Sequence, residues 1–298
     1  MKYYKDSFHP YAWVSIFFWS LTAVLTRLAL QYFSAFSLGF LRYLIASVVL
    51  LAVAALYKMK PPRPKDLLWF LASGGTGFFL YMIAYNQGQA VVTAATGSVV
   101  IAMAPVLTAL LTWLIYREKI RPHQWAAVFI EFAGVAVLTL MNGVFSVNRG
   151  LFWLFFAALS LSIYNLLQRK LTKTYDSLQT AAYSIFFGTL LLAVFAPESF
   201  QALRHAPAIQ WFYLLILGVG ASAIAYVSWA KAFSKTKQSS QVSNYMFITP
   251  LLTSVLGFLL AGEVPDRGTL IGGGIIMTGV LIFNFGGMLF GPAEWKKT

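Results

Sequence analysis

Ten long apolar runs joined by short polar connections constrain this chain more than any other feature of its sequence. About 20 apolar residues in a row is the length that an α-helix needs to cross the hydrocarbon core of a bilayer. Helix breakers such as Pro61, Pro62 and Pro197 fall between the runs. We therefore predict an all-α integral membrane protein with ten transmembrane helices. The predicted spans are 10–30, 37–57, 67–88, 93–115, 123–141, 150–169, 179–196, 209–230, 240–260 and 269–290.

The composition excludes a soluble globular fold. Hydrophobic residues make up 59% of the 298 residues and charged residues only 10%, with a mean hydropathy of +0.72. A soluble domain carries roughly 25% charged residues. Lys2 and Lys5 precede an apolar stretch, as in a signal peptide, but no convincing small-residue cleavage site follows. We therefore predict that this stretch is an uncleaved first helix.

The distribution of basic residues predicts how the spans are oriented. The net charge of +13 would suit a nucleic-acid partner, but the basic residues lie mostly in short loops between apolar runs. Of these residues, 17 fall on one side of the alternating spans and five on the other. Positive loops favour the cytoplasm, so we expect both termini there, in the cell inner (plasma) membrane, and no nucleic acid. The five outer residues are Arg27, Arg42, Arg149, Arg204 and Arg267.

The two halves of the chain repeat each other. An offset of 145 residues carries Pro105 to Pro250 and Glu118 to Glu263. Each half holds five spans, an odd number, so the second copy enters the membrane from the opposite side. We predict one repeat over 1–145 and an inverted one over 146–298, an architecture found in secondary transporters. The other matches are Thr108–Thr253, Gly134–Gly279, Gly75–Gly220 and Tyr81–Tyr226, and, at an offset of 142, Ser20–Ser162 and Arg27–Arg169.

These features resemble the drug/metabolite transporter superfamily, in particular its EamA-type members. The likeness rests on the two five-helix repeats, on a proline in helices 4 and 9 followed by a glutamate, and on the pairs Gly134-Val135 and Gly279-Val280. It extends over nearly the whole chain. The resemblance implies that helices 1, 3, 4, 6, 8 and 9 enclose a central cavity and that helices 2, 5, 7 and 10 are more peripheral. It also implies that a small metabolite is exported.

Aromatic and amide side chains on the cavity-forming helices are the candidate substrate-binding residues. Aromatic faces with a few hydrogen-bonding groups suit amphiphilic solutes and attract cations. Interfacial anchoring or ordinary helix packing is the alternative for each residue taken alone. The candidates are Trp19, Tyr81, Tyr85, Tyr164, Asn165, Tyr226, Trp229, Asn244 and Phe247.

Pro105 and Pro250 are candidate hinges. A proline in the middle of a helix removes a backbone hydrogen bond and kinks the helix, and these two lie at equivalent places near the middle of their spans. We predict a symmetric pair of kinks beside the cavity. Proline is also simply commoner in membrane helices than in soluble ones, which is the competing explanation.

Glu131 lies about midway along the fifth span, where a carboxylate costs roughly 2.5–3.5 kcal/mol on insertion scales. It is a candidate for proton or cation coupling, or else a protonated side chain that hydrogen-bonds a neighbouring helix. For Arg27 and Arg42 we expect snorkelling to lipid headgroups. The alternative is that they line the outer mouth and attract carboxylates. Small residues at the start of helix 10, including Gly268 and Gly272, leave monomer and homodimer both open.

Missing motifs narrow the function further. The sequence has no Walker A loop, nucleophile elbow, paired-histidine motif or cysteine, so we expect no enzyme activity, no metal and no cofactor. We predict a secondary active transporter that exports a small amphiphilic metabolite, such as an amino acid or related compound, by alternating access. An importer or exchanger of a cationic amine, or a flippase for a lipid-linked substrate, is the alternative; a proton is a possible coupling ion.

Overall fold

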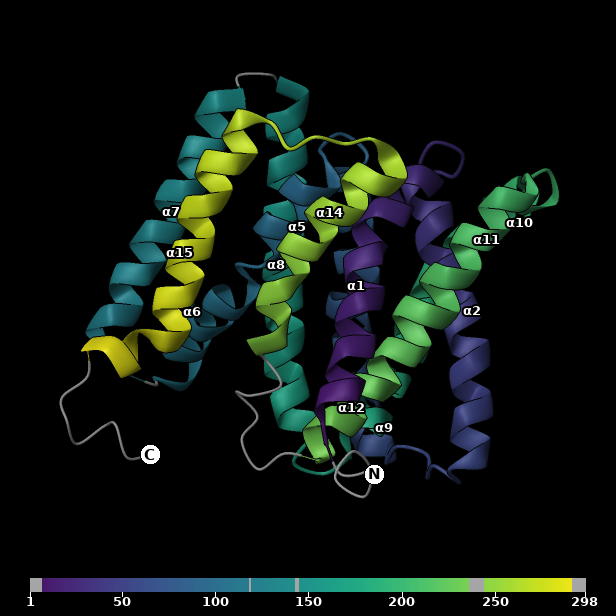
Figure 1. Ribbon diagram of the computed structural model, residues 1–298. Coiled ribbons are helices and arrows are strands. Elements are labelled where there is room, and N and C mark those ends of the chain that lie inside the picture. Colours follow the sequence, from purple (N-terminus) through teal and green to yellow (C-terminus); the bar gives the residue numbers. More distant parts are fainter. Residues whose placement is uncertain (1–6, 118, 143–144, 236–243, 291–298) are drawn as a thin grey trace.

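The computed structural model describes residues 7–117, 119–142, 145–235 and 244–290, and every regular element within these ranges is helical (Figure 1). The elements of the first half are α1 His9–Ala29, α2 Ala35–Leu56, η2 Pro64–Asp66, α3 Leu67–Gly74, η3 Gly75–Leu80, α4 Tyr81–Gln89, α5 Ala94–Ile101, α6 Ala104–Tyr116 and α7 Pro122–Asn142. Those of the second half are α8 Phe145–Leu171, α9 Ser177–Leu192, η4 Ala193–Phe195, α10 Ala196–Arg204, α11 Ala208–Leu215, η5 Ile216–Ile224, α12 Ala225–Ser234, η6 Asn244–Ile248, α14 Thr249–Ala261 and α15 Arg267–Phe290.

These elements stack into ten spans. Eight stretches of the described chain are long and apolar enough to cross a membrane. The other two spans are α7, with 21 residues, and α14, a shorter apolar helix of 13 residues that continues from η6. Several spans consist of consecutive pieces, such as α5 with α6 and α11 with η5 and α12. The prediction of an all-α membrane protein with ten transmembrane helices is confirmed.

The ends of the spans gather on two faces of the bundle. α1 begins and α15 ends on the same face, at the bottom of Figure 1, which we call the terminal face. α8, the first span of the second half, begins on the opposite face and runs antiparallel to α1. The second half is therefore inverted relative to the first, as the odd number of spans per repeat requires.

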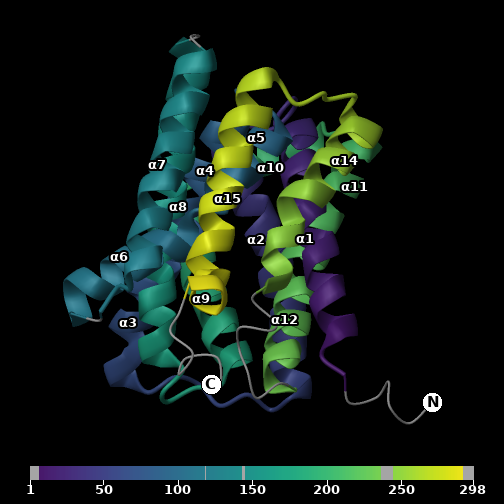
Figure 2. The same ribbon diagram turned by 60° about the vertical axis from the view of Figure 1, so that its left-hand side comes forward.

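The helix pair α7–α15 stands at one side of the bundle and shows the repeat at the level of single contacts (Figures 1 and 2). Gly134 packs against Ile276, and Gly279 packs against Glu131. An offset of 145 turns the first contact into the second, because Gly134 corresponds to Gly279 and Glu131 to Ile276. Glycine allows the two backbones to approach closely here.

The helices α2 and α9 meet where the two repeats face each other. The hydroxyl groups of Ser47 and Thr189 lie 2.8 Å apart and hydrogen-bond one another. These residues are 142 positions apart, the offset of the early spans of each half. Equivalent residues that touch must lie close to the pseudo-two-fold axis. Buried side chains including Tyr43, Met82 and Ile185 form the core around this contact.

Two wide helical turns also obey the repeat. The third and eighth spans each contain a π-helical segment, η3 and η5, which hold the equivalent glycines Gly75 and Gly220. Neighbouring glycines allow close contacts: a side chain at Gly77 would collide with the ring of Tyr164. π-helical turns are rare and are found often at functional sites. Both segments adjoin residues that face the space between the halves.

Candidate substrate cavity

A cavity of about 490 Å³ lies between the two halves. Its described walls come from the first four spans of each half, and none comes from α7 or α15. The resemblance implied that helices 2 and 7 are more peripheral than the six expected spans, but α2 and α9 also contribute to the cavity wall. The lining residues are Trp19, Thr22, Ala23, Arg42, Tyr43, Tyr81, Tyr85, Ser98, Ile101, Ala102, Ala104, Pro105, Leu161, Tyr164, Asn165, Gln168, Thr172, Ser177, Ala181, Tyr226, Trp229, Met246, Thr249, Pro250 and Thr253.

Aromatic rings make up much of the wall, and they contact one another. Trp19 lies with its ring centroid 5.0 Å from that of Trp229 and 5.6 Å from that of Tyr226, both edge-on. Tyr81 and Tyr85 stack at 5.5 Å. These contacts, like the hydrogen bond of 3.2 Å from the Trp19 indole to the Ala221 carbonyl, hold the rings in fixed orientations. Amphiphilic surfaces of this kind bind solutes that are partly apolar.

The structure brings most of the predicted binding residues together. Trp19, Tyr81, Tyr85, Tyr164, Asn165, Tyr226 and Trp229 all line the cavity, and Asn165 donates a hydrogen bond of 3.1 Å to Thr108. The side chains of Asn244 and Phe247 lie outside the described part of the chain. Sequence reasoning missed Tyr43 and gave Arg42 a place in the outer mouth only as the alternative to snorkelling; both residues line the cavity from α2.

Pro105 and Pro250 line the cavity, but they do not kink continuous helices as we predicted. α5 ends at Ile101, and α6 starts afresh at Ala104, so that Pro105 stands in the first turn of a new helix. Pro250 stands likewise in the first turn of α14. A proline costs nothing at this position, because the first N–H groups of a helix have no partner within it. The spans are therefore broken helices rather than kinked ones.

Equivalent serines fix the two breaks. Ser162 on α8 donates a hydrogen bond of 2.9 Å to the carbonyl oxygen of Ala104, and Ser20 on α1 donates one of 3.5 Å to that of Thr249. Both the serines and the carbonyls are related by the repeat offsets. Each broken span is thus tied, at its break, to the first helix of the other half. A movement of one half against the other acts directly on these contacts.

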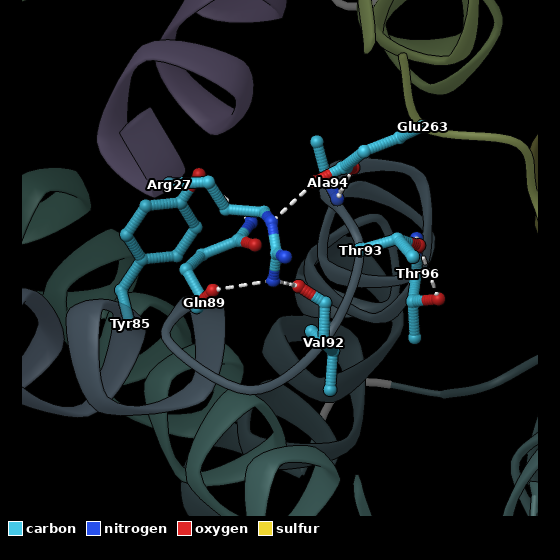
Figure 3. Close-up of polar contacts among 8 residues, drawn as sticks. All are labelled: Arg27, Tyr85, Gln89, Val92, Thr93, Ala94, Thr96 and Glu263. Carbon is cyan, nitrogen blue, oxygen red and sulfur yellow. Dashed lines mark hydrogen bonds and ion pairs between the residues drawn. The ribbon is translucent and has the colours of Figure 1, made fainter. Parts of the chain in front are cut away.

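Near the opposite face, an ion pair lies beyond the residues that line the cavity (Figure 3). The Arg27 guanidinium at the end of α1 pairs with the Glu263 carboxylate, which follows α14. The same guanidinium donates to the carbonyls of Gln89 and Val92, at the turn between α4 and α5. The N–H of Ala94, in the first turn of α5, donates to Glu263 at 2.8 Å. The pair and its hydrogen bonds therefore join four spans, and the snorkelling predicted for Arg27 was wrong.

At the terminal face the cavity is open. Thr172 and Ser177, at the turn between α8 and α9, line it and are exposed. Arg169, the repeat equivalent of Arg27, lies just before this turn, with its guanidinium 5.3 Å from the ring of Tyr116. Glu118, the repeat equivalent of Glu263, lies outside the described residues. The cavity is thus accessible from one face and closed toward the other.

Arg42 does not snorkel to headgroups either. Its side chain is buried, and its Nε donates a hydrogen bond of 2.7 Å to Ser222 on η5. Its guanidinium lies 5.5 Å from the ring centroid of Tyr43. Arg42 stands seven residues beyond the start of α2, about 10 Å into the bundle at 1.5 Å per residue. Hydropathy placed Arg42 near a span end, because the predicted span begins at residue 37, two residues after the helix itself begins at Ala35.

Glu131 lies away from the cavity. It is buried between α7 and α15 against Gly279, and neither carboxyl oxygen has a hydrogen-bond partner among the described residues. The hydrogen bond to a neighbouring helix that we considered for a protonated Glu131 is therefore not seen there. Within the described ranges, no group of three or more acidic or histidine side chains is arranged to hold a metal ion.

Comparison with known proteins agrees with this geometry. The EamA-like transporter family matches the chain twice, over residues 9–140 and 148–285. The chain belongs to the EamA-like transporter family. It is a multi-pass membrane transporter rather than an enzyme, and a small molecule is its substrate. The two matches correspond to the two inverted halves.

Relatives cover most of the chain at low identity. A protein of Streptantibioticus cattleyicolor described as a "Probable terminal-alkyne amino-acid exporter" is 28% identical over 89% of each chain. The "Uncharacterized transporter YdfC" of Bacillus subtilis is 29% identical over 85% of this chain and 83% of its own. A crystal structure with 20% identity has a TM-score of 0.59, covers 93% of this chain and 96% of the other, and shows the fold alone.

Proposed function

We propose that this EamA-family protein is a secondary active transporter that exports a small amphiphilic metabolite, an amino acid or a related compound, by alternating access. The observation that carries the proposal is the cavity between two inverted halves, open at the terminal face and closed at the opposite face by Arg27 and Glu263. A cavity accessible from one side at a time is the working element of such transporters. The relative described as an amino-acid exporter supports this substrate class.

The chemistry of the walls supports the choice of an amphiphile. Aromatic side chains, among them Trp19, Tyr81 and Trp229, offer apolar surface. Asn165 and Gln168 add hydrogen-bonding groups from one face of α8. Ligand pockets of this kind are mostly apolar, with a few polar groups that fix the orientation of the ligand. The cavity volume of about 490 Å³ lies within the range of small-molecule sites.

Alternation follows from the inverted repeat. In the described state the Arg27–Glu263 pair closes the opposite face. The repeat equivalent of Arg27 is Arg169, which lies near the terminal face. We propose that the first pair separates in the other state, while the spans around Arg169 close the terminal face. The two states are then related by the pseudo-two-fold axis, and the two halves exchange their roles.

Sidedness completes the proposal. α2 and α8 end, and α7 begins, at the terminal face (Figure 1). The basic residues next to these helix ends in the sequence include Lys58, Arg121 and Lys173. By the positive-inside rule this face is cytoplasmic, with both termini, in the plasma membrane. The described state is then open to the cytoplasm, where an exporter loads its substrate. Uptake of a cationic amine is the weaker alternative, because Arg42 places a positive charge in the cavity wall.

Flux measurements in proteoliposomes test the proposal. We expect the purified protein to move at least one compound from a panel of amino acids and related amphiphiles, faster under an imposed proton gradient. Trp19→Ala removes a cavity ring and should slow this flux several-fold. Trp211→Ala is the matched control, because Trp211 lies on α11 outside the cavity and is exposed. The proposal fails if nothing in the panel moves with or without the gradient.

A further inference from the structure

Arg42 is the one charged residue among the described residues that line the cavity. Its side chain is 5% exposed. Its Nε is satisfied by Ser222, but its Nη1 is buried without a hydrogen-bond partner in the described part of the chain. No described carboxylate forms an ion pair with it. The cavity therefore contains a cation whose counter-charge the described walls do not supply.

The surroundings of Arg42 hold this cation in place. Gly218 lies against the backbone carbonyl of Arg42 and the side chain of Ile45, where an added Cβ would come within 3.0 Å of both. This close approach of η5 to α2 brings Ser222, one turn further on, to the Arg42 Nε. The ring of Tyr43 lies 5.5 Å from the guanidinium. Packing and one hydrogen bond thus orient the guanidinium, and its Nη1 has no hydrogen-bond partner in the described part of the chain.

An unpaired cation inside a membrane bundle is costly, and such residues are kept for function. A guanidinium presents a planar set of N–H donors that matches a carboxylate, and it remains charged at all physiological pH values. Charge-assisted hydrogen bonds of this kind are also stronger than neutral ones. Residues that could supply the missing negative charge are absent from the described walls. The substrate itself is then the source of that charge.

We infer that Arg42 binds the carboxylate of the transported substrate. The inference rests on the proposed transport function and deepens it, because it assigns a chemical class: an amphiphile with a single carboxylate and an apolar remainder. The carboxylate contacts the guanidinium of Arg42, which lines the cavity. The remainder lies among the rings of Trp19, Tyr81 and Trp229, which line the same space.

The second half of the chain lacks this charge. The offset of 142 that relates Ser47 to Thr189 also carries Arg42 to Ser184, a neutral residue. Ser184 is fully satisfied by Ser73, at 2.8 Å, and by the carbonyl of Thr180. The cavity therefore has one cationic end rather than two. It suits a substrate with one anionic group better than a dicarboxylate.

Matched ligands test the inference directly. The probes are L-leucine and L-phenylalanine, and each is compared with its carboxamide and with the amine that lacks the carboxylate. Binding is measured by thermal shift, and transport by flux into proteoliposomes. We expect the wild type to prefer the carboxylates. In Arg42→Gln the preference should disappear, with carboxylate affinity lowered roughly tenfold to a hundredfold, the range for lost charge-assisted hydrogen bonds. Arg204→Gln, the same change at an exposed position, should leave it unaltered.

The absence of cysteine in the sequence allows a chemical rescue that a purely structural role would not show. Arg42→Cys can be modified with 2-aminoethyl methanethiosulfonate, which restores a cation, or with methyl methanethiosulfonate, which does not. Only the first reagent should restore the carboxylate preference. Two outcomes would overturn the role of Arg42 without affecting the transport proposal. One is equal rescue by both reagents, and the other is equal affinity of the wild type for carboxamides and carboxylates. Failure of the wild type to bind or move any probe would overturn both proposals.

Discussion

Two regions of this bundle bury an ionisable side chain, and they surround it differently. Arg42 lines the cavity. Its Nε donates a hydrogen bond to Ser222, and its Nη1 has no described partner. Glu131 is packed between α7 and α15 against Gly279, outside that cavity. Both are buried and incompletely paired within the described structure. Only Arg42 lies where a solute reaches it, so burial of a charge does not by itself identify a functional residue.

The repeat sharpens this contrast. Glu131 occupies the place that Ile276 occupies in the other half, because each packs on an equivalent glycine. A position that an isoleucine fills in one repeat serves helix packing. We therefore interpret the α7–α15 pair as a structural strut, whereas the first four spans of each half line the cavity. Three predictions test this division, beginning with the largest expected effect.

The strut should be intolerant of bulk at its closest contact. In Gly279→Leu the new Cβ would lie 2.5 Å from the Cγ of Glu131 and 3.0 Å from the carbonyl oxygen of Ala127. Overpacking of this kind costs about 1–3 kcal/mol, or more where backbone is involved. We expect a much lower melting temperature in detergent and a poor yield of folded protein.

Gly274→Leu is the matched control on the same helix. Nothing lies within 4 Å of a Cβ added there, so we expect a melting temperature close to that of the wild type. If both leucine variants melt alike, tight packing of α7 on α15 is not what stabilises this region, and the strut interpretation is wrong.

The sequence predicted the ten spans better than it predicted the cavity. Apolar runs and the 145-residue offset were enough for ten spans in two inverted halves, since bilayer thickness and chain parity fix both. With the cavity-forming helices that the EamA resemblance implies, they also led to seven predicted binding residues that line the cavity, such as Tyr81 and Tyr226. Hydropathy cannot distinguish a lipid-facing side from a protein-facing one. It therefore misplaced Arg42, and it also missed the part of α2 in the cavity wall.

Local breaks in the helices were hidden for a related reason. Pro105 and Pro250 predicted a departure from regular helix, but the choice between a kink and a fresh helix start depends on neighbouring side chains. Ser162 and Ser20, which lie on other helices, donate hydrogen bonds to backbone carbonyls at the two breaks. The π-helical turns likewise depend on packing around Gly77 and Gly220, which a single sequence does not reveal.

A second, smaller effect concerns access to the cavity from the two faces. A single cysteine at Ser98, a lining residue, provides a reporter in a chain without other cysteines. A membrane-impermeant thiol reagent should label it from the terminal face and only slowly from the opposite face. In Glu263→Gln, which removes the partner of Arg27, we expect labelling from the opposite face to rise by roughly fivefold, in keeping with an ion pair of about 1 kcal/mol.

The double variant Arg27→Glu/Glu263→Arg supplies the control for that measurement. It preserves the pairing of opposite charges, so labelling should return toward the wild-type pattern. The return should be incomplete, because the carbonyls of Gln89 and Val92 lose the hydrogen bonds that Arg27 donates. Labelling that stays slow from the opposite face in Glu263→Gln would mean that other contacts close this end of the cavity.

The smallest functional effect is expected at Glu131. Because its carboxyl oxygens have no described partner and its repeat equivalent is isoleucine, Glu131→Ile should raise the melting temperature, by removing a buried polar group that costs about 1–3 kcal/mol. Transport should continue, since Glu131 does not line the cavity. Glu131→Gln, which keeps the shape and loses the ionisable group, should likewise retain gradient-driven uptake. Loss of that uptake, with exchange between equal pools spared, would instead place Glu131 in proton coupling and make the strut part of the transport machinery.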